Sequence, residues 1–168
     1  QAFCGELFGD YGDLPREKSG RHVYGSTPYP PDKPILFHNE SSHMHRWPQK
    51  QFFFCLQAAQ EGGQTPIVDG RLMFKGLRPD LRERLREKQL MYVRNFVPGV
   101  DVSWQDFFRT SDKAEVEALC AKNGMDWQWL EKGGLRTKQV CPAIIEHPDT
   151  GESVFFNQIQ LHHVSCLE

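Results

Sequence analysis

The sequence lacks the patterns that mark several large classes of protein. Its 168 residues carry a formal net charge of −2 and a pI near 6.4, without the basic stripe that neutralises phosphates. No apolar run approaches the roughly 20 residues of a membrane span, and the first residues lack the charged-then-apolar order of a signal peptide. We therefore expect no nucleic-acid partner, no membrane and a cytoplasmic location.

Motifs of the common site chemistries are also missing. The five cysteines are an odd number without a CxxC pair, which disfavours a disulfide framework or a zinc ribbon: Cys4, Cys55, Cys120, Cys141 and Cys166. We expect them to be reduced and mostly buried. No GxGxxG, Walker loop, HExxH or GxSxG motif occurs, so the sequence does not indicate a nucleotide-binding protein, a zincin metalloprotease or an α/β-hydrolase.

The residues that are present suit one domain, with 39% hydrophobic and 12% aromatic side chains to build a core. Aromatic and branched residues predict strands over 35–40 and 51–59, and leucines at every fourth position predict an amphipathic helix over 71–89. A strand over 90–96, helices over 103–108 and 111–124, and strands with a hairpin over 135–158 follow. Strands at both ends favour a β-sandwich or jelly roll carrying a helical insertion at about 71–135.

The segment "FHNE" is the first candidate for chemistry. Alternation along a strand places His38 and Glu40 on one face, where an imidazole and a carboxylate supply two metal ligands. A further histidine would complete the 2-His-1-carboxylate triad of mononuclear non-haem Fe(II) oxygenases. The alternatives are a surface pair beside a strand end, and a zinc site made of His38, His43 and His45.

The order of several motifs is more specific than the tripeptide. "FHNE", "WPQKQFFFCLQAA", "GGQTPIVDGRLMFKGL", "YVRNF", "SWQDFFRT", "LRTKQVCPAI" and "HPDTGESVFFNQ" together resemble the TauD/TfdA family of Fe(II)/2-oxoglutarate-dependent dioxygenases. The likeness is to its clavaminate synthase-like and SyrP-like members, which use HxE where others use HxD. It implies a mainly β fold, the double-stranded β-helix (cupin-like jelly roll), over a single partial domain of residues 1–168.

The resemblance assigns roles to particular residues. It implies that His38 and Glu40 are iron ligands and that Thr65, in "GGQTP", helps to hold a carboxylate of 2-oxoglutarate. Gly62 and Gly63 permit the tight turn that places this threonine. Related halogenases have a small residue in place of the carboxylate, so Glu40 favours hydroxylation or desaturation, between which the sequence does not choose.

Other motif residues have less definite roles. Arg94, in "YVRNF", could pair a substrate carboxylate bidentately or anchor the helical insertion by a salt bridge. His43 lies in a loop that we expect at the mouth of the site, either touching substrate or simply exposed to solvent. We interpret Asn157, in "FFNQ", as a structural hydrogen-bonding residue.

The sequence departs from the family pattern near its end. The family's distal histidine and the arginine that grips 2-oxoglutarate are not found, because His162 and His163 follow "FFNQ" too closely to be the third ligand. The chain begins with Gln1 and stops at Glu168 after an apolar stretch, so we expect a piece of a longer polypeptide. We expect this chain alone to leave sheet edges exposed and not to catalyse turnover of a substrate.

The leading hypothesis is an oxygenase that uses Fe(II), 2-oxoglutarate and O2 to hydroxylate or desaturate an amino acid or similar small carboxylate, as in natural-product pathways. The alternative is a non-catalytic or truncated jelly-roll module that binds a ligand or partner. Neither reading fixes the oligomeric state, and a homo-oligomer stays open.

Overall fold

The computed structural model describes residues 18–20, 23–25, 33, 35–99 and 102–162. This part of the chain forms two compact units. The first is built around residues 90–141 and includes residues 43–45, together with the short antiparallel pair β1 (Lys18–Gly20) and β2 (Val23–Tyr24). The second contains residues 36–42, 46–89 and 142–162.

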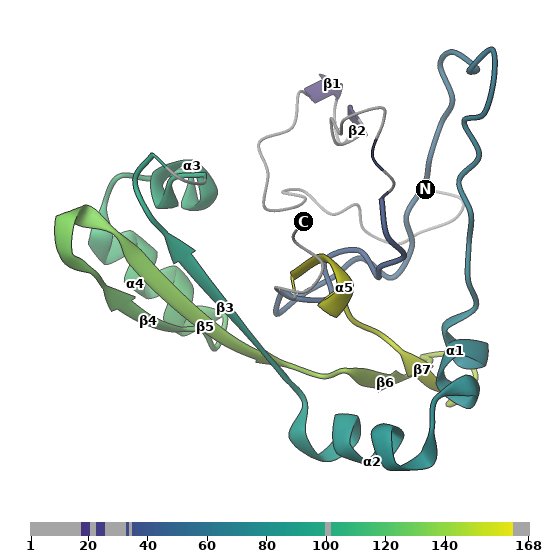
Figure 1. Ribbon diagram of the computed structural model, residues 1–168. Helices are drawn as coiled ribbons and strands as arrows, with labels where there is room; N and C mark the ends of the chain where they lie inside the picture. The colour runs from purple at the N-terminus through teal and green to yellow at the C-terminus, as the bar shows by residue number, and fades with distance from the viewer. Residues whose placement is uncertain (1–17, 21–22, 26–32, 34, 100–101, 163–168) are drawn as a thin grey trace. The chain divides into compact units, whose positions relative to one another are not determined.

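The first unit is a three-stranded antiparallel sheet with helices (Figure 1). Its strand order is β3 (Leu90–Phe96), β5 (Leu135–Cys141), β4 (Asp126–Trp129), so β5 is central. Two helices, α3 (Trp104–Phe108) and α4 (Lys113–Lys122), lie between β3 and β4 in the chain, and a 3-10 turn, η1 (Glu131–Gly133), joins β4 to β5. This arrangement lets β5 share hydrogen bonds with a strand on each side.

One face of this sheet holds the core of the first unit. The buried residues of β5 alternate, as a strand with one covered face requires. Leu135 is the member of β5 that joins the apolar cluster, which also takes in side chains of β3 and of the two helices: Phe96, Trp104, Val116, Cys120, Met125 and Leu135. The rings of Phe96 and Phe107 lie 5.0 Å apart, and those of Trp104 and Trp129 lie 5.2 Å apart edge to face.

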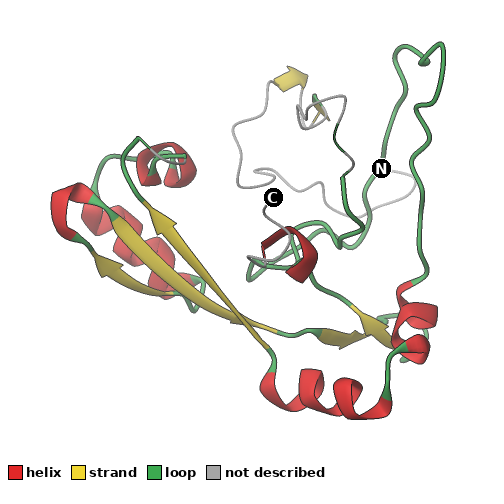
Figure 2. Ribbon diagram, viewed as in Figure 1, coloured by secondary structure: helices red, strands yellow, loops and turns green. Residues whose placement is uncertain are grey.

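The second unit is built from helices and a hairpin. It contains α1 (Gly70–Gly76), α2 (Pro79–Lys88), the antiparallel pair β6 (Ile144–Glu146) and β7 (Ser153–Phe155), and α5 (Ile159–His162). α1 packs directly on β7, since a Cβ added at Gly70 would lie 2.6 Å from Val154 Cγ1. Figure 2 shows in green that residues 35–69, which lead into α1, run as loops and turns.

Two strand predictions are wrong. Residues 35–40 and 51–59 carry neither strand nor helix. The aromatic composition is that of a strand, but a strand forms only where a neighbour supplies backbone hydrogen bonds, and no strand in the described residues pairs with these segments. Phe53 and Phe54 are 77% and 85% exposed as a result.

The helical predictions are confirmed with changed boundaries. The helix expected over 71–89 is two helices, because Pro79 disfavours a helical conformation at the preceding residue and Arg78 adopts ψ 142°. α3 and α4 form as predicted, and Asp112 caps α4, its side chain accepting from the backbone N–H of Ala114. The strands and hairpin after residue 135 are confirmed, while β4 was not predicted.

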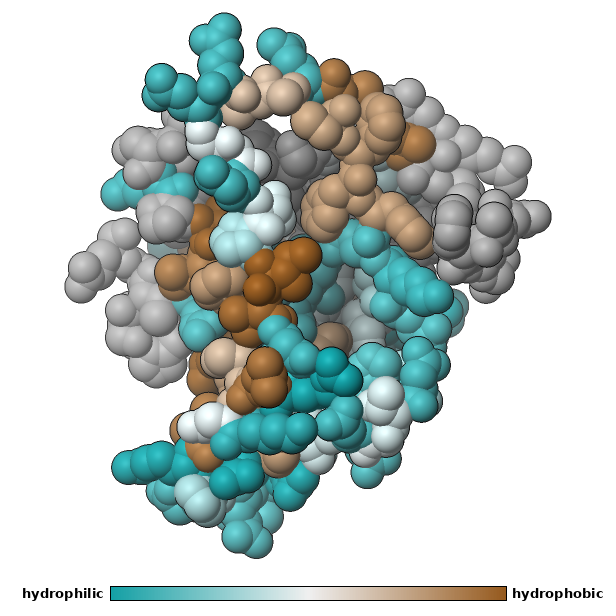
Figure 3. Space-filling model, turned by 90° about the vertical axis from the view of Figure 1, so that its right-hand side faces the viewer, coloured by the Kyte–Doolittle hydropathy of each residue, from teal (hydrophilic) through white to brown (hydrophobic). Residues whose placement is uncertain are grey.

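Apolar side chains remain uncovered on the face that Figure 3 presents. The large exposed apolar residues include Phe52, Leu56 and Ile67, of which the last two are each 90% exposed. Among the described cysteines, Cys120 and Cys141 are buried and Cys55 is exposed, and all three are free thiols. None of the helices in the described ranges combines the length and apolar character needed to cross a membrane.

Candidate metal site at His38 and Glu40

The side chains of His38 and Glu40 lie together. His38 Nε2 is 3.3 Å from Glu40 Oε2, and the two side chains are 24% and 27% exposed. The expected adjacency is therefore confirmed, although the backbone is a loop that enters a turn at Glu40. The two side chains are thus brought together by a loop, and not by the alternation of side chains along a strand.

A second hydrogen bond fixes the orientation of the His38 ring. Nδ1 lies 2.8 Å from the carbonyl oxygen of Leu36. A carbonyl only accepts, so Nδ1 carries a proton and donates it. The nitrogen that faces Glu40 is Nε2, and in the neutral ring this atom presents a lone pair.

The same contacts raise the pKa of His38 above its ordinary value. The largest cause is the hydrogen bond to Glu40; the Leu36 carbonyl and the Glu40 charge act in the same direction, and partial burial opposes them. Glu40 therefore favours a positive charge at Nε2. A site that stabilises a proton between an imidazole and a carboxylate is electrostatically suited to a cation.

These donors fit a divalent metal. Histidine ligands typically donate their other ring N–H to a backbone carbonyl, as His38 does to Leu36. An imidazole nitrogen together with a carboxylate oxygen suits iron among other transition metals. His38 and Glu40 are therefore the residues of the described chain that could hold such an ion, and they supply two ligands.

A third ligand is not assembled in the described part of the chain. Across residues 35–99 and 102–162, no group of three His, Cys, Asp or Glu side chains could hold a metal. The zinc site of His38, His43 and His45 accordingly receives no support. His162 lies in α5, and His163 lies outside the described residues.

Hydrogen bonds hold the backbone around the pair. Asn39, between the two candidate ligands, donates its backbone N–H to Asn157 O at 3.2 Å and accepts the backbone N–H of Asn157 at Oδ1 at 3.1 Å. Ser41 follows with φ 57°, which turns the chain immediately after Glu40. Sequence reasoning assigned Asn157 a structural hydrogen bond but gave no role to Asn39, since no local pattern connects residues so far apart.

Thr65 lies in the exposed loop that leads into α1. Gly62 and Gly63 before it adopt φ 70° and 77°, a left-handed backbone that glycine adopts easily. In the described structure, no hydrogen bond links Thr65 with His38 or Glu40. All three belong to the second unit.

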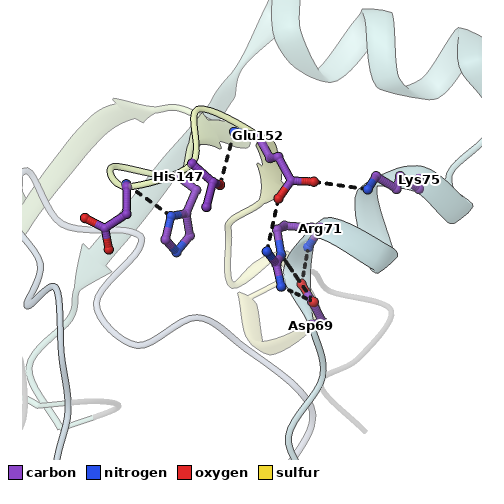
Figure 4. Close-up of polar contacts among 7 residues, drawn as sticks. Asp69, Arg71, Lys75, His147 and Glu152 are labelled. Carbon is purple, nitrogen blue, oxygen red and sulfur yellow. Dashed lines mark hydrogen bonds and ion pairs between the residues drawn. The ribbon is translucent and has the colours of Figure 1, made fainter.

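An ion-pair cluster fixes the helix that follows the Thr65 loop (Figure 4). Asp69 caps α1 through a 2.8 Å hydrogen bond from the backbone N–H of Arg71, and the Arg71 guanidinium reaches Asp69 at 2.7 Å and Glu152 at 3.0 Å. Lys75 lies 3.1 Å from the other oxygen of Glu152. Arg71 lowers the pKa of Asp69 to about 2, and Lys75 and Arg71 lower that of Glu152.

The two proposed substrate residues belong to the first unit. The Arg94 guanidinium lies 4.8 Å and 4.7 Å from the ring centres of Phe96 and Phe107, which are cation–π distances. The His43 ring meets Tyr92 edge to face at 5.9 Å. With its side-chain amide turned by 180°, Gln139 would donate to His43 O at 3.2 Å and accept from His45 N at 3.0 Å, on either side of Met44.

An imidazole and a carboxylate lie two residues apart, with the ring anchored to a carbonyl, and they are two donors of the kind that mononuclear metal sites use. The family model for taurine catabolism dioxygenase TauD, TfdA family, matches residues 3–167. The chain belongs to this family and has clavaminate synthase-like relatives.

Two curated relatives cover most of the chain. Dapdiamide synthesis protein DdaC of Enterobacter agglomerans is 40% identical over 153 residues, which is 91% of this chain and 46% of the relative. A clavaminate synthase-like protein of Arabidopsis thaliana is 32% identical over 158 residues, which is 88% of this chain and 48% of the relative. The chain thus spans about half the length of the curated relatives it matches.

Proposed function

We propose that the protein is a non-haem Fe(II)- and 2-oxoglutarate-dependent oxygenase. The observation that carries this proposal is the His38–Glu40 pair, with Nε2 3.3 Å from Oε2 and Nδ1 tied to the Leu36 carbonyl. Membership of the TauD/TfdA family supports the same reading. The metal and 2-oxoglutarate would supply oxygen activation, and the protein supplies the ligands and their orientation.

The residues of the pair have separable tasks. His38 would bind through Nε2, while its Nδ1–H bond to Leu36 keeps the ring from rotating. Glu40 would contribute an oxygen and neutralise one positive charge of the ion. Because Glu40 fills a position that halogenases of this family leave for chloride, we propose hydroxylation or desaturation as the reaction.

Thr65 is proposed to donate its hydroxyl to a carboxylate of 2-oxoglutarate. The positive φ angles of Gly62 and Gly63 support this role, because they are a backbone conformation for which glycine is needed just before Thr65. The ion pairs between α1 and the β6–β7 hairpin support it too, since they restrain the end of that loop. The threonine hydroxyl carries one O–H, which can donate to a carboxylate oxygen.

The proposed substrate is an amino acid or a similar small carboxylate. The name of the Enterobacter relative gives it a part in dapdiamide synthesis, which supports a natural-product pathway for this chain as well. Arg94 and His43 are the proposed substrate contacts, Arg94 through bidentate pairing with a carboxylate. The aromatic rings of Phe96 and Phe107, which the Arg94 guanidinium contacts, would restrain its orientation for such pairing.

The proposed fold of the complete catalytic domain is a cupin-like jelly roll with a helical insertion at about residues 71–135. The antiparallel pairing of every strand in the described ranges supports this fold. A cytoplasmic location completes the proposal.

The test is 2-oxoglutarate turnover in the complete encoded protein. With Fe(II), O2 and a panel of amino acids, we expect succinate to form in proportion to product, and Glu40→Ala to abolish it. Lys88→Ala, which changes an exposed residue at the end of α2, is the control and should keep full activity. A well-folded wild-type protein that forms no succinate with any small carboxylate would contradict the proposal.

A further inference from the structure

The tripeptide of residues 38–40 is held at its middle residue. Asn39 offers Asn157 both a backbone donor and a side-chain acceptor, at 3.2 Å and 3.1 Å. Two bonds to one residue restrain both the position and the rotation of the backbone at Asn39. The partner lies 118 residues further along the chain, so this is a tertiary contact and not a local turn.

Asn157 is itself buried and hydrogen-bonded through both its backbone and its side chain. It is only 3% exposed, its Nδ2 donates to Ala143 O at 3.2 Å, and its Oδ1 accepts from the backbone N–H of Ile159 at 3.2 Å. The neighbouring Phe156 N–H donates to the same Ala143 carbonyl at 3.0 Å. A buried amide with all its groups paired is a rigid anchor, because breaking any one bond leaves an unpaired polar group.

The carbonyl of Asn39 is also engaged. It accepts from the backbone N–H of Ser42 at 3.2 Å and from the Ser42 hydroxyl at 2.7 Å, and Ser42 is fully buried. The N–H, the carbonyl and the side-chain oxygen of Asn39 are thus all bonded. Its two neighbours, His38 and Glu40, extend from a backbone that cannot turn without breaking these bonds.

We propose that Asn39 and Asn157 are the positioning residues of the metal site, their paired hydrogen bonds holding His38 and Glu40 in the arrangement that binds Fe(II). This inference rests on the proposed function. Neither asparagine touches the ion; each acts through the backbone that carries the ligands. Outer-shell partners of this kind typically change metal affinity by about 10- to 100-fold.

The experiment compares the Mn(II) affinity of variants of the complete encoded protein, with free Mn(II) measured by electron paramagnetic resonance under anaerobic conditions. Asn39→Ala removes the acceptor for the Asn157 N–H, and we expect it to weaken binding by about 10- to 100-fold. Asn39→Asp keeps the acceptor and should bind at least as tightly as wild type. Asn95→Ala is the matched control, since Asn95 Oδ1 also accepts one hydrogen bond, from Arg136 Nε at 2.7 Å.

A purely structural role predicts a different result. Asn39→Ala would then lower the melting temperature but leave the affinity of the folded protein unchanged, and this outcome would overturn the inference. If Asn39→Ala fails to fold, Ser42→Ala takes its place, because it removes only the 2.7 Å bond to Asn39 O. We expect this milder variant to lose affinity several-fold, and an unchanged affinity overturns the inference equally.

Failure of the proposed function gives a separate signature. If the wild-type protein binds neither Mn(II) nor Fe(II), the function fails, and the positioning role is judged on the metal-free protein by imidazole ¹⁵N spectra of His38. Loss of the His38 Nε2 bond to Glu40 in Asn39→Ala then supports positioning. Retention of that bond overturns it.

Discussion

The helix α1 has a glycine at each end, and their different surroundings give a quantitative test of the packing in the second unit. An added Cβ at Gly70 would lie 2.6 Å from Val154 Cγ1 and 3.1 Å from the backbone oxygen of Phe155. At Gly76 an added Cβ would meet nothing within 4 Å. Neither glycine has the positive φ that only glycine adopts easily.

The two alanine variants should therefore change stability in opposite directions. Gly70→Ala forces Val154 or the β7 backbone to move, and overpacking of this kind costs about 1–3 kcal/mol. Gly76→Ala meets no obstacle and gains helix propensity, so we expect a change between zero and about 1 kcal/mol in favour of folding. Gly76→Ala thus serves as the matched control within the same helix.

The assay is equilibrium urea unfolding of both variants and wild type, followed by circular dichroism, with the free energy of unfolding taken from the midpoint and slope. The account predicts a midpoint below wild type for Gly70→Ala and at or above wild type for Gly76→Ala. Equal midpoints for the two variants would refute the close packing of α1 on β7.

Three further predictions concern other parts of the chain. Phe96→Ala should cost about 3–5 kcal/mol by urea unfolding, because Phe96 is 1% exposed in the core of the first unit; a loss under 1 kcal/mol would exclude this packing. Asp69 should titrate by NMR near pH 2 and return toward its ordinary value in Arg71→Ala, since its lowered pKa means that its stabilising effect is present above about pH 4 and lost as the pH falls through about 2. The raised pKa of His38 means that its pair with Glu40 stabilises the fold fully below about pH 6.5 and is lost as the pH rises through the folded-state value; Glu40→Gln should lower that pKa in an NMR titration, and an unshifted titration would rule out the contact.

Local sequence patterns predicted the elements whose signals lie within one continuous stretch of the chain. The capping side chains and apolar spacing of α3 and α4 lie within one stretch of sequence, as does the turn between β6 and β7. β4 was missed because its four residues, DWQW, are too short to show a period. Its place in the sheet depends on pairing with β5, which no local pattern reveals.

The sequence predicted the two candidate ligands but not the residues that hold their backbone in place. His38 and Glu40 were identified by residue type and spacing, and their contact holds although the predicted strand does not form. Asn39 and Asn157 are joined across 118 residues, so only the three-dimensional fold brings them together. The third ligand was not predicted within this sequence, and the described residues assemble no set of three.

The most direct test of the central claim is an anaerobic titration of the complete encoded protein with Fe(II) and 2-oxoglutarate, followed by visible absorption. The account predicts the metal-to-ligand charge-transfer band of an Fe(II)–2-oxoglutarate chelate, lost in Glu40→Ala and weakened in Thr65→Ala. A well-folded protein that shows no band, or a band indifferent to Glu40, would contradict the assignment of His38 and Glu40 as iron ligands.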